Sequence, residues 1–177
     1  PRGYNTDYSG FIAAYRRVRG QVPPGAVLMI GTGGVGRVVA FGLVALGVSD
    51  LRLVDLDRAK ADTLADDLRK SAPMLNVTVG EDAQTAARGA QGLINCTPVG
   101  MEGLPGTPLP RASMAGAAWA FDAVYTPRDT RFLIDAAAEG LTIVSGWELF
   151  FYQGVHAWKL FADLPLDETR LRHDLES

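Results

Sequence analysis

Three glycines in the first quarter of the chain have the spacing of a phosphate-binding turn. Gly31, Gly33 and Gly36 follow the pattern G-x-G-x-x-G in the stretch MIGTGGVGRV, between a short apolar run and a long apolar segment. In a strand-to-helix turn, Gly31 permits the tight bend, Gly33 lets a pyrophosphate approach the backbone, and Gly36 lets the helix pack closely. The pattern predicts a dinucleotide site, with Gly34 and Val35 at the helix N-terminus. A glycine-rich turn without a ligand is the alternative.

A carboxylate follows the next apolar run at the distance expected for a ribose ligand. Asp55 lies 19 positions after Gly36, in the stretch LRLVDLD. A carboxylate there accepts hydrogen bonds from ribose hydroxyls and repels a 2′-phosphate. Leu56 comes next and cannot pair with a phosphate, so the sequence favours NAD, with NADP the weaker candidate. Arg58 and Lys60 are the counter-evidence, because either side chain could reach a phosphate.

Short apolar runs alternate with helical patterns along most of the chain. Strands are predicted over 26–30, 51–55, 76–79, 92–96, 118–125 and 141–144, and helices over 35–47, 58–72 and 131–140. This alternation indicates βαβ units and a parallel sheet with helices on both faces. The predicted fold is therefore α/β, a doubly wound Rossmann-type sheet of about six strands, with an extra N-terminal helix and C-terminal helices. Asp57 is expected to cap the helix that starts at residue 58.

Two segments lie outside this alternating series. One is a predicted helix over about residues 8–18, and the other is the stretch WELFFYQGVHAWKLF, which is apolar nearly all round. Such a helix needs cover on more than one side, so it either packs on the sheet or meets another domain or subunit. The expected organisation is a linker helix in 1–20, a nucleotide-binding domain in 21–145 and C-terminal helices in 146–177.

The composition is typical of a soluble globular protein. Of the 177 residues, 47% are hydrophobic and 21% are charged. A net charge of −3 without a basic block argues against nucleic acid or a membrane surface as a partner. No apolar run approaches the roughly 20 residues of a membrane helix. The single cysteine, Cys96, fits a reducing cytoplasm, and His156 and His173 are too isolated to suggest a metal site.

Five stretches, taken in order, resemble the shikimate/quinate dehydrogenase family: YNTDYSGF, GTGGVGRVVAFGL, INCTPVGM, FDAVYTPRDTRFL and GWELFFYQGVHAWKLF. The resemblance runs from residue 3 to about residue 162 and covers the second half of that family's fold, since a substrate domain precedes the NTD stretch in family members. It implies the NAD-binding half of an oxidoreductase. The implied reaction is hydride transfer between nicotinamide and a ring hydroxyl of shikimate or quinate, which are small polyol acids.

The resemblance also implies roles for four residues near the substrate. Asp7 matches an acid that handles the proton of the reacting hydroxyl together with a Lys of the substrate domain. Its alternative role is to cap the helix that starts at residue 8. Asn5 belongs to the same junction, and Tyr125 and Gln153 match residues that face the substrate. For Tyr125 the alternative is a core aromatic at the rim, and a buried Gln153 amide would need hydrogen-bond partners.

Further residues are expected on the nicotinamide side of the site. Asn95, Thr97 and Pro98 follow the fourth predicted strand, at the sheet edge where ligands bind, although an ordinary loop is the alternative. Gly146 matches a family glycine whose backbone lies against the nicotinamide. Cys96 is expected to be a buried small side chain and not a nucleophile.

Three functional hypotheses remain open at this point. The first is the catalytic half described above, which we expect to be inactive without the Lys-bearing domain. The second is a non-catalytic dinucleotide-binding module that dimerises or docks through its C-terminal helix. The third is the nucleotide half of another two-domain dehydrogenase.

Overall fold

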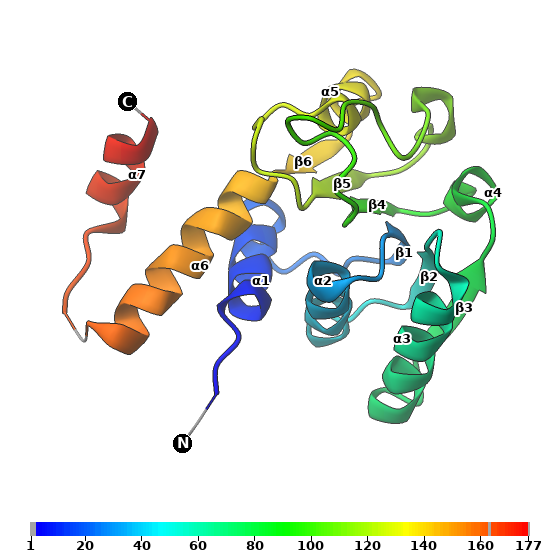
Figure 1. Cartoon of the computed structure of the whole chain (residues 1–177), viewed down its shortest axis with the longest axis horizontal. Coiled ribbons are helices and arrows are strands. Elements are labelled where there is room, and N and C mark those ends of the chain that lie inside the picture. Colours follow the sequence, from blue (N-terminus) through cyan, green and yellow to red (C-terminus); the bar gives the residue numbers. More distant parts are fainter. Residues whose placement is uncertain (1–2, 163, 177) are drawn as a thin grey trace.

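The centre of the protein is one parallel β-sheet (Figure 1). The computed structural model describes residues 3–162 and 164–176, so residues 1, 2, 163 and 177 of the expected segments lie outside the described residues. The strands are β1 Ala26–Ile30, β2 Asp50–Val54, β3 Asn76–Gly80, β4 Gly92–Asn95, β5 Trp119–Asp122 and β6 Thr142–Val144. They form one six-stranded sheet in the order β3-β2-β1-β4-β5-β6, and every neighbouring pair is parallel. The prediction of a doubly wound parallel sheet of about six strands is confirmed.

The central strands are apolar on both faces. In β1, Val27 and Met29 belong to one core, while Leu28 and Ile30 belong to a second core on the opposite face. This alternation follows from the two-residue period of a strand. Because helices cover both faces of a parallel sheet, the strand appears in the sequence as an uninterrupted apolar run.

Helices cover both faces of the sheet. The first core lies under α1 Thr6–Arg19, α2 Gly34–Ala45 and α3 Arg58–Ser71. The second lies under α5 Arg131–Ala138 and the segment that contains α4 Ala83–Ala87. The sequence did not predict α4 or the 3₁₀ turn η1 Arg111–Ser113, because five and three residues are too few to show a helical period.

The C-terminal helix α6 Gly146–Phe161 packs mainly against α1, and only its N-terminal part reaches the core over the sheet, through Leu149. The expectation that this helix packs on the sheet therefore holds only for its first turn. The reason is that α1 already occupies the sheet at this place, where its Phe11 and Tyr15 make edge-to-face contacts with Phe121 and Trp119 of β5, each at 5.0 Å between ring centroids. Gly10 of α1 allows the two helices to approach closely.

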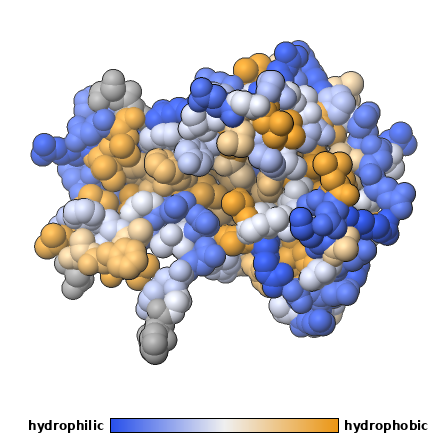
Figure 2. All heavy atoms as spheres, viewed as in Figure 1, coloured by the Kyte–Doolittle hydropathy of each residue, from blue (hydrophilic) through white to orange (hydrophobic). Residues whose placement is uncertain are grey.

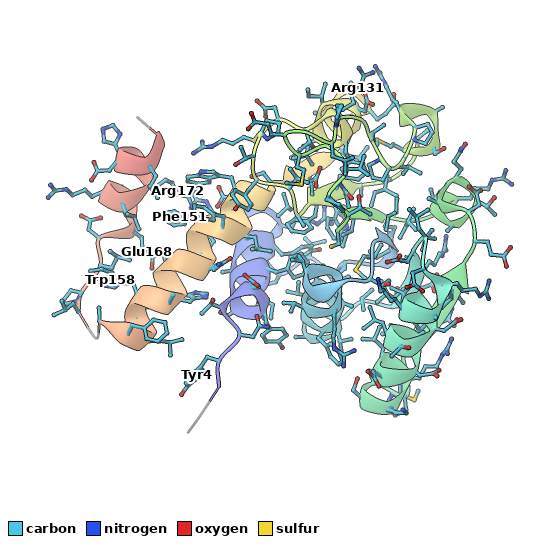
Figure 3. The ribbon with its side chains drawn as sticks, viewed as in Figure 1. Tyr4, Arg131, Phe151, Trp158, Glu168 and Arg172 are labelled. Carbon is cyan, nitrogen blue, oxygen red and sulfur yellow. The ribbon has the colours of Figure 1, made fainter. Side chains whose placement is uncertain are left out.

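The last helix, α7 Glu168–Glu176, lies on the outer side of α6, where Leu171 packs against an apolar cluster of α6 and Glu168 pairs with Lys159 at 2.9 Å. Figure 3 shows Arg172 and Phe151 between the two helices. The guanidinium of Arg172 lies 4.0 Å from the ring centroid of Phe151 and donates two hydrogen bonds, of 2.7 and 2.9 Å, to the carboxylate of Glu148. This combination of stacking and bidentate pairing fixes α7 on α6.

Parts of the surface over α6 stay apolar. Phe150, Trp158 and Phe161 are 42%, 43% and 89% exposed. Figure 2 shows hydrophobic side chains gathered over this end of the molecule, whereas hydrophilic ones dominate over α3. Among the described residues, no helix has the length and apolarity needed to cross a bilayer.

The strand order changes direction between β1 and β4. The chain proceeds from β1 outward to β2 and β3, and then returns to place β4, β5 and β6 on the other side. The loops after β1 and β4 therefore leave the sheet in opposite directions and open a crevice at the carboxyl ends of these strands, which is where ligands of such sheets bind.

Candidate functional site

Two adjoining cavities form one cleft at this crevice. The large cavity has a volume of ≈ 670 Å³ and extends from the loop after β1 to the ends of β2 and β3. The small cavity has a volume of ≈ 390 Å³ and extends from the same loop to the segment after β5. Gly33, Cys96, Thr97 and Pro98 line both cavities. The cleft is thus long and divided at its middle by the glycine loop, a shape that suits an extended ligand.

The glycines of this loop are required by close backbone contacts. Gly31 has a φ of +94°, and a Cβ on it would lie 2.7 Å from the carbonyl carbon of Cys96. A Cβ on Gly36 would collide with the carbonyl oxygen of Gly31, so only glycine lets α2 start this close to β1. Nothing lies within 4 Å of a Cβ built on Gly33 or Gly34. These two positions face open space, which leaves room for a ligand beside the backbone.

The N-terminus of α2 is available to an anion. Gly33 is its N-cap, no side chain caps the first turn, and the first turn contains no acidic residue. The first N–H groups of a helix have no partner within the helix, and the helix dipole is positive at this end. Gly34 and Val35 of this turn line the small cavity. The loop therefore has the geometry and the polarity of a phosphate site.

Asp55 lies directly beyond β2 at the wall of the large cavity and also fixes the glycine loop. Its Oδ2 accepts hydrogen bonds from the backbone N–H and the hydroxyl of Thr32, at 2.6 and 2.8 Å, and its Oδ1 accepts from the N–H of Asp57 at 2.9 Å. Burial raises the pKa of Asp55, but these hydrogen bonds and the charge of Lys60 outweigh it and lower the pKa. The carboxylate is charged at neutral pH and keeps an acceptor position on Oδ1.

The neighbours of Asp55 differ in their surroundings. Leu56 is completely exposed and lines the large cavity, so it offers an apolar surface there. Asp57 occupies the N-cap position of α3 as predicted, but its side chain makes no capping hydrogen bond. It lies instead 3.4 Å from Lys60, while Arg58 pairs with Glu81 at 2.6 Å. Arg58 and Lys60, the two cations that could have paired with a 2′-phosphate, therefore both form ion pairs with acids of the chain.

A buried polar network supports the opposite side of the cleft. Asp122 is fully buried at the end of β5 and accepts hydrogen bonds from the Asn95 amide (3.0 Å), the Thr130 hydroxyl (2.6 Å) and the Val124 N–H (3.0 Å). Burial raises the pKa of Asp122 to about 6, although these three hydrogen bonds act to lower it. Sequence reasoning missed Asp122, and the one available signal was an acid inside the apolar run AWAFDAVY.

Asn95 lies behind the cleft and not on its surface. Its side chain is fully buried, donates to the carbonyl of Val99, and accepts hydrogen bonds from the N–H and hydroxyl of Thr97, at 2.9 and 2.7 Å. Thr97 and Pro98 line both cavities. The contact of Thr97 and Pro98 with a cofactor stays a prediction. Because Asn95 is buried, its side chain can influence a ligand only by holding the loop of Thr97 and Val99 in place.

Cys96 forms part of the floor where the cavities meet. Burial, and then the nearby charge of Asp122, raise the pKa of its thiol. A protonated thiol is a poor nucleophile, which agrees with the expectation of a small packing residue.

Tyr125 forms one wall of the small cavity. It lies three residues beyond the end of β5 and not within the strand as expected. Its side chain is 50% exposed, and its ring stacks on that of Phe150 from α6 at 4.9 Å with an angle of 13°. The core alternative for Tyr125 is wrong, because the ring faces the cleft from the rim.

Gly146 begins α6 beside this wall. A Cβ on Gly146 would lie 2.6 Å from the carbonyl oxygen of Asp122 and would also collide with that of Val124. The helix start is thereby held against the segment that follows β5. A contact of Gly146 with nicotinamide stays a prediction.

The junction at the start of the chain has a different cap from the one expected. The N-cap of α1 is Asn5, whose Oδ1 accepts a hydrogen bond of 3.0 Å from the N–H of Tyr8. Asp7 instead lies in the first helical turn, so its capping alternative is wrong. It forms no hydrogen bond or ion pair with any part of the chain that the structure describes, and it is partly exposed.

Gln153 lies across from this junction on α6. A Cβ on Gly10 would be 3.0 Å from the backbone nitrogen of Gln153, so the two helices touch there. Asp7 precedes Gly10 by one helical turn, on nearly the same face of α1. The Gln153 side chain is only partly buried and, within residues 3–162 and 164–176, has no hydrogen-bond partner. Asp7 thus lies one helical turn away from the place where α1 touches the backbone of Gln153.

The described residues contain no group of three or more acids, cysteines or histidines that could hold a metal ion. His156 lies on the α1–α6 contact, where its Nδ1 is 2.7 Å from the hydroxyl of Ser9. Burial, and then the charge of Lys159, lower the pKa of His156. It is a packing residue of this contact.

The chain is similar in sequence to shikimate and quinate/shikimate dehydrogenases. The chain is 37% identical to a shikimate dehydrogenase (NADP(+)) of Arthrobacter sp. (strain FB24), over 98% of this chain and 60% of that protein. It is 37% identical to a quinate/shikimate dehydrogenase (NAD(+)) of Corynebacterium efficiens, over 96% of this chain and 61% of that protein. The chain thus spans about three fifths of the length of these relatives. No protein-family model matches it.

A solved structure shows the same arrangement of elements. Quinate dehydrogenase from Corynebacterium glutamicum in complex with NAD superimposes with a TM-score of 0.86 and 34% identity, covering 97% of this chain and 61% of that one. The resemblance found in the sequence is therefore confirmed over nearly the whole of this chain.

Proposed function

We propose, from the premise that this chain is homologous to the nucleotide-binding half of the shikimate/quinate dehydrogenases, that it binds a nicotinamide dinucleotide in the cleft at the switch point. One observation carries the proposal. The cleft has a glycine loop and a free helix N-terminus at its middle, and the charged Asp55 at one end. The loop holds the pyrophosphate, the large cavity holds the adenosine, and the small cavity holds the nicotinamide.

The enzyme of which such a half is part oxidises a ring hydroxyl of a small polyol acid such as shikimate or quinate, or reduces the matching ketone. The cofactor, when bound, supplies the hydride chemistry. Asp7, free of partners within the described chain, pairs with a Lys of the substrate domain and helps to move the hydroxyl proton. Tyr125 and Gln153 orient the substrate, and Asn5 holds the junction by capping α1.

The substrate domain docks beside α6 in this proposal. The exposed apolar side chains of Phe150, Trp158 and Phe161 support a contact with another domain or with a second copy of the chain. Turnover requires the Lys that the resemblance assigns to the substrate domain, so residues 1–177 by themselves bind the cofactor without catalysing the reaction. The unpaired thiol of Cys96 suits a reducing cytoplasm.

We further propose that the preferred cofactor is NAD, although named relatives use both NAD and NADP. Asp55 keeps an acceptor position for a ribose hydroxyl, and its charge repels a 2′-phosphate. Leu56 offers no charge to a phosphate, and Arg58 and Lys60 are paired with acids.

Replacing Asp55 with alanine is expected to raise the Kd for NADH on the order of ten- to a hundredfold, because a hydrogen bond to a charged group is lost. The Kd for NADPH is expected to change much less. Calorimetric titration of the parent and the variant with each cofactor measures both effects.

A matched variant separates the two roles of Asp55. Thr32→Val removes the hydroxyl that fixes the loop to Asp55 but keeps the carboxylate and the Thr32 N–H bond. It should weaken both cofactors by a similar small factor. Equal losses of NADH and NADPH in the Asp55 variant would show that the carboxylate does not bind the ribose.

A further inference from the structure

The adenosine end of the large cavity is acidic. Asp55, Glu81 and Asp82 line it, and Lys60 is the one cation among the lining residues. Lys60 lies 3.4 Å from Asp57, a fourth acid. A cofactor that carries a 2′-phosphate would bring its additional negative charge to this end, beside the ribose carboxylate Asp55.

A second cation near this end of the cavity, Arg58, forms an ion pair with an acid. Arg58, the first residue of α3, is held by Glu81, the residue directly after β3. Its Nη1 lies 2.6 Å from the Glu81 carboxylate, and its Nε lies 3.6 Å from Asp62. The Arg58–Glu81 pair joins the start of α3 to the end of β3, the strand next to β2. Glu81 lines the same cavity as Asp55 and Leu56. Arginine is the side chain best suited to bind a phosphate, and here its donors point to a carboxylate.

We propose that Glu81 is a determinant of cofactor choice that excludes NADPH: it occupies the guanidinium of Arg58 and adds a negative charge at the rim of the adenosine end. The inference rests on the proposed function and extends it to a residue outside the glycine loop and Asp55. The Arg58–Glu81 pair is exposed, with 55% and 85% of the two side chains accessible, so the pair itself is weak. Removing the Glu81 charge therefore costs the fold little stability, while it frees the guanidinium of Arg58 and reduces the repulsion of a 2′-phosphate.

The test is Glu81→Gln, which keeps the size of the side chain and removes its charge. The Kd values of the parent chain and the variant for NADH and NADPH are measured by calorimetry at low ionic strength, where charge effects are largest. The expected result is a Kd for NADPH lowered about five- to thirtyfold, with the Kd for NADH changed less than about threefold. The double variant Glu81→Gln with Arg58→Gln should lose most of this gain, because Arg58 is the released ligand.

Asp66→Asn is the matched control for net charge. Asp66 lies on α3 and pairs with Arg69 at 3.0 Å, and it does not line the cavity. This variant should leave the ratio of the two Kd values unchanged. An Asp66 variant that gains NADPH affinity as strongly as the Glu81 variant, or a double variant that keeps the full gain, would overturn the proposal.

Failure of this inference is distinguishable from failure of the proposed function. If the parent binds NADH and the Glu81 variant shows the same ratio of Kd values, the inference is wrong and the proposed function stands. If the parent binds neither cofactor, both are wrong.

Discussion

Replacing Gly36 with alanine is expected to lower the free energy of unfolding by about 1–3 kcal/mol and to abolish detectable NADH binding. The new Cβ would collide with the carbonyl oxygen of Gly31 and lie 2.9 Å from its carbonyl carbon. Both atoms belong to backbone, so α2 must move away from β1, and the loop that binds the pyrophosphate moves with it. For a protein of this size the expected drop in Tm is about 2–12 °C. Thermal melting and NADH titration measure the two effects.

Gly33→Ala is the matched variant with the same added methyl group. No atom lies within 4 Å of that position, and the φ of Gly33 is −66°, which alanine adopts readily. The Tm should stay within about 2 °C of the parent, whereas NADH binding should weaken at least tenfold, because the methyl group stands where the pyrophosphate must approach. If Gly33→Ala bound NADH as well as the parent, the pyrophosphate would not lie against this loop.

Replacing Asp122 with alanine is expected to lower the free energy of unfolding by about 3–5 kcal/mol. The change leaves the buried donors of Asn95, Thr130 and Val124 without their shared acceptor. The same donors hold the loops on both sides of the small cavity, so NADH binding should weaken in parallel. Denaturant unfolding measures the loss. A loss below about 1 kcal/mol would show that the network is not a stabilising element.

The pH dependence of stability provides a separate test of the same residue. Burial raises the pKa of Asp122 from an ordinary value of about 3.9 to about 6, so the folded state binds the proton more tightly than the unfolded state. The stabilising contribution is complete below about pH 4 and is lost as the pH rises through about 6. Asp122→Asn cannot titrate. The stability of the parent relative to that of Asp122→Asn should therefore fall by about 2–3 kcal/mol between pH 4 and pH 7. A constant difference would show that Asp122 has an ordinary pKa.

The strands and the parallel sheet could be predicted from the sequence because they depend on patterns within short stretches of the chain. The strand 26–30 was found with its observed bounds, since an apolar run between a Pro-Pro-Gly breaker and a glycine turn has few alternatives. The roles of Gly31 and Gly36 were also foreseen, and backbone contacts in the structure show why no other residue fits. Both conclusions needed only the order of residues along a short stretch.

Features that depend on contacts across the fold could not be predicted in this way. Asn5 and Asp7 are both good caps, and Asn5 is the cap because α1 begins at Thr6, two residues before the predicted start. The network around Asp122 joins Asn95 and Thr130, which are 27 and eight residues away, so no local pattern shows it. Tyr125 was placed on a strand because its neighbours are apolar, whereas the strand ends at the buried Asp122.

Calorimetric titration of the chain with NADH, and separately with NADPH, tests the central claim most directly. The cleft at the switch point predicts saturable binding of one NADH per chain, and the acids around Asp55 predict a distinctly weaker binding of NADPH. Binding of neither cofactor would contradict the claim that these residues form a nucleotide site.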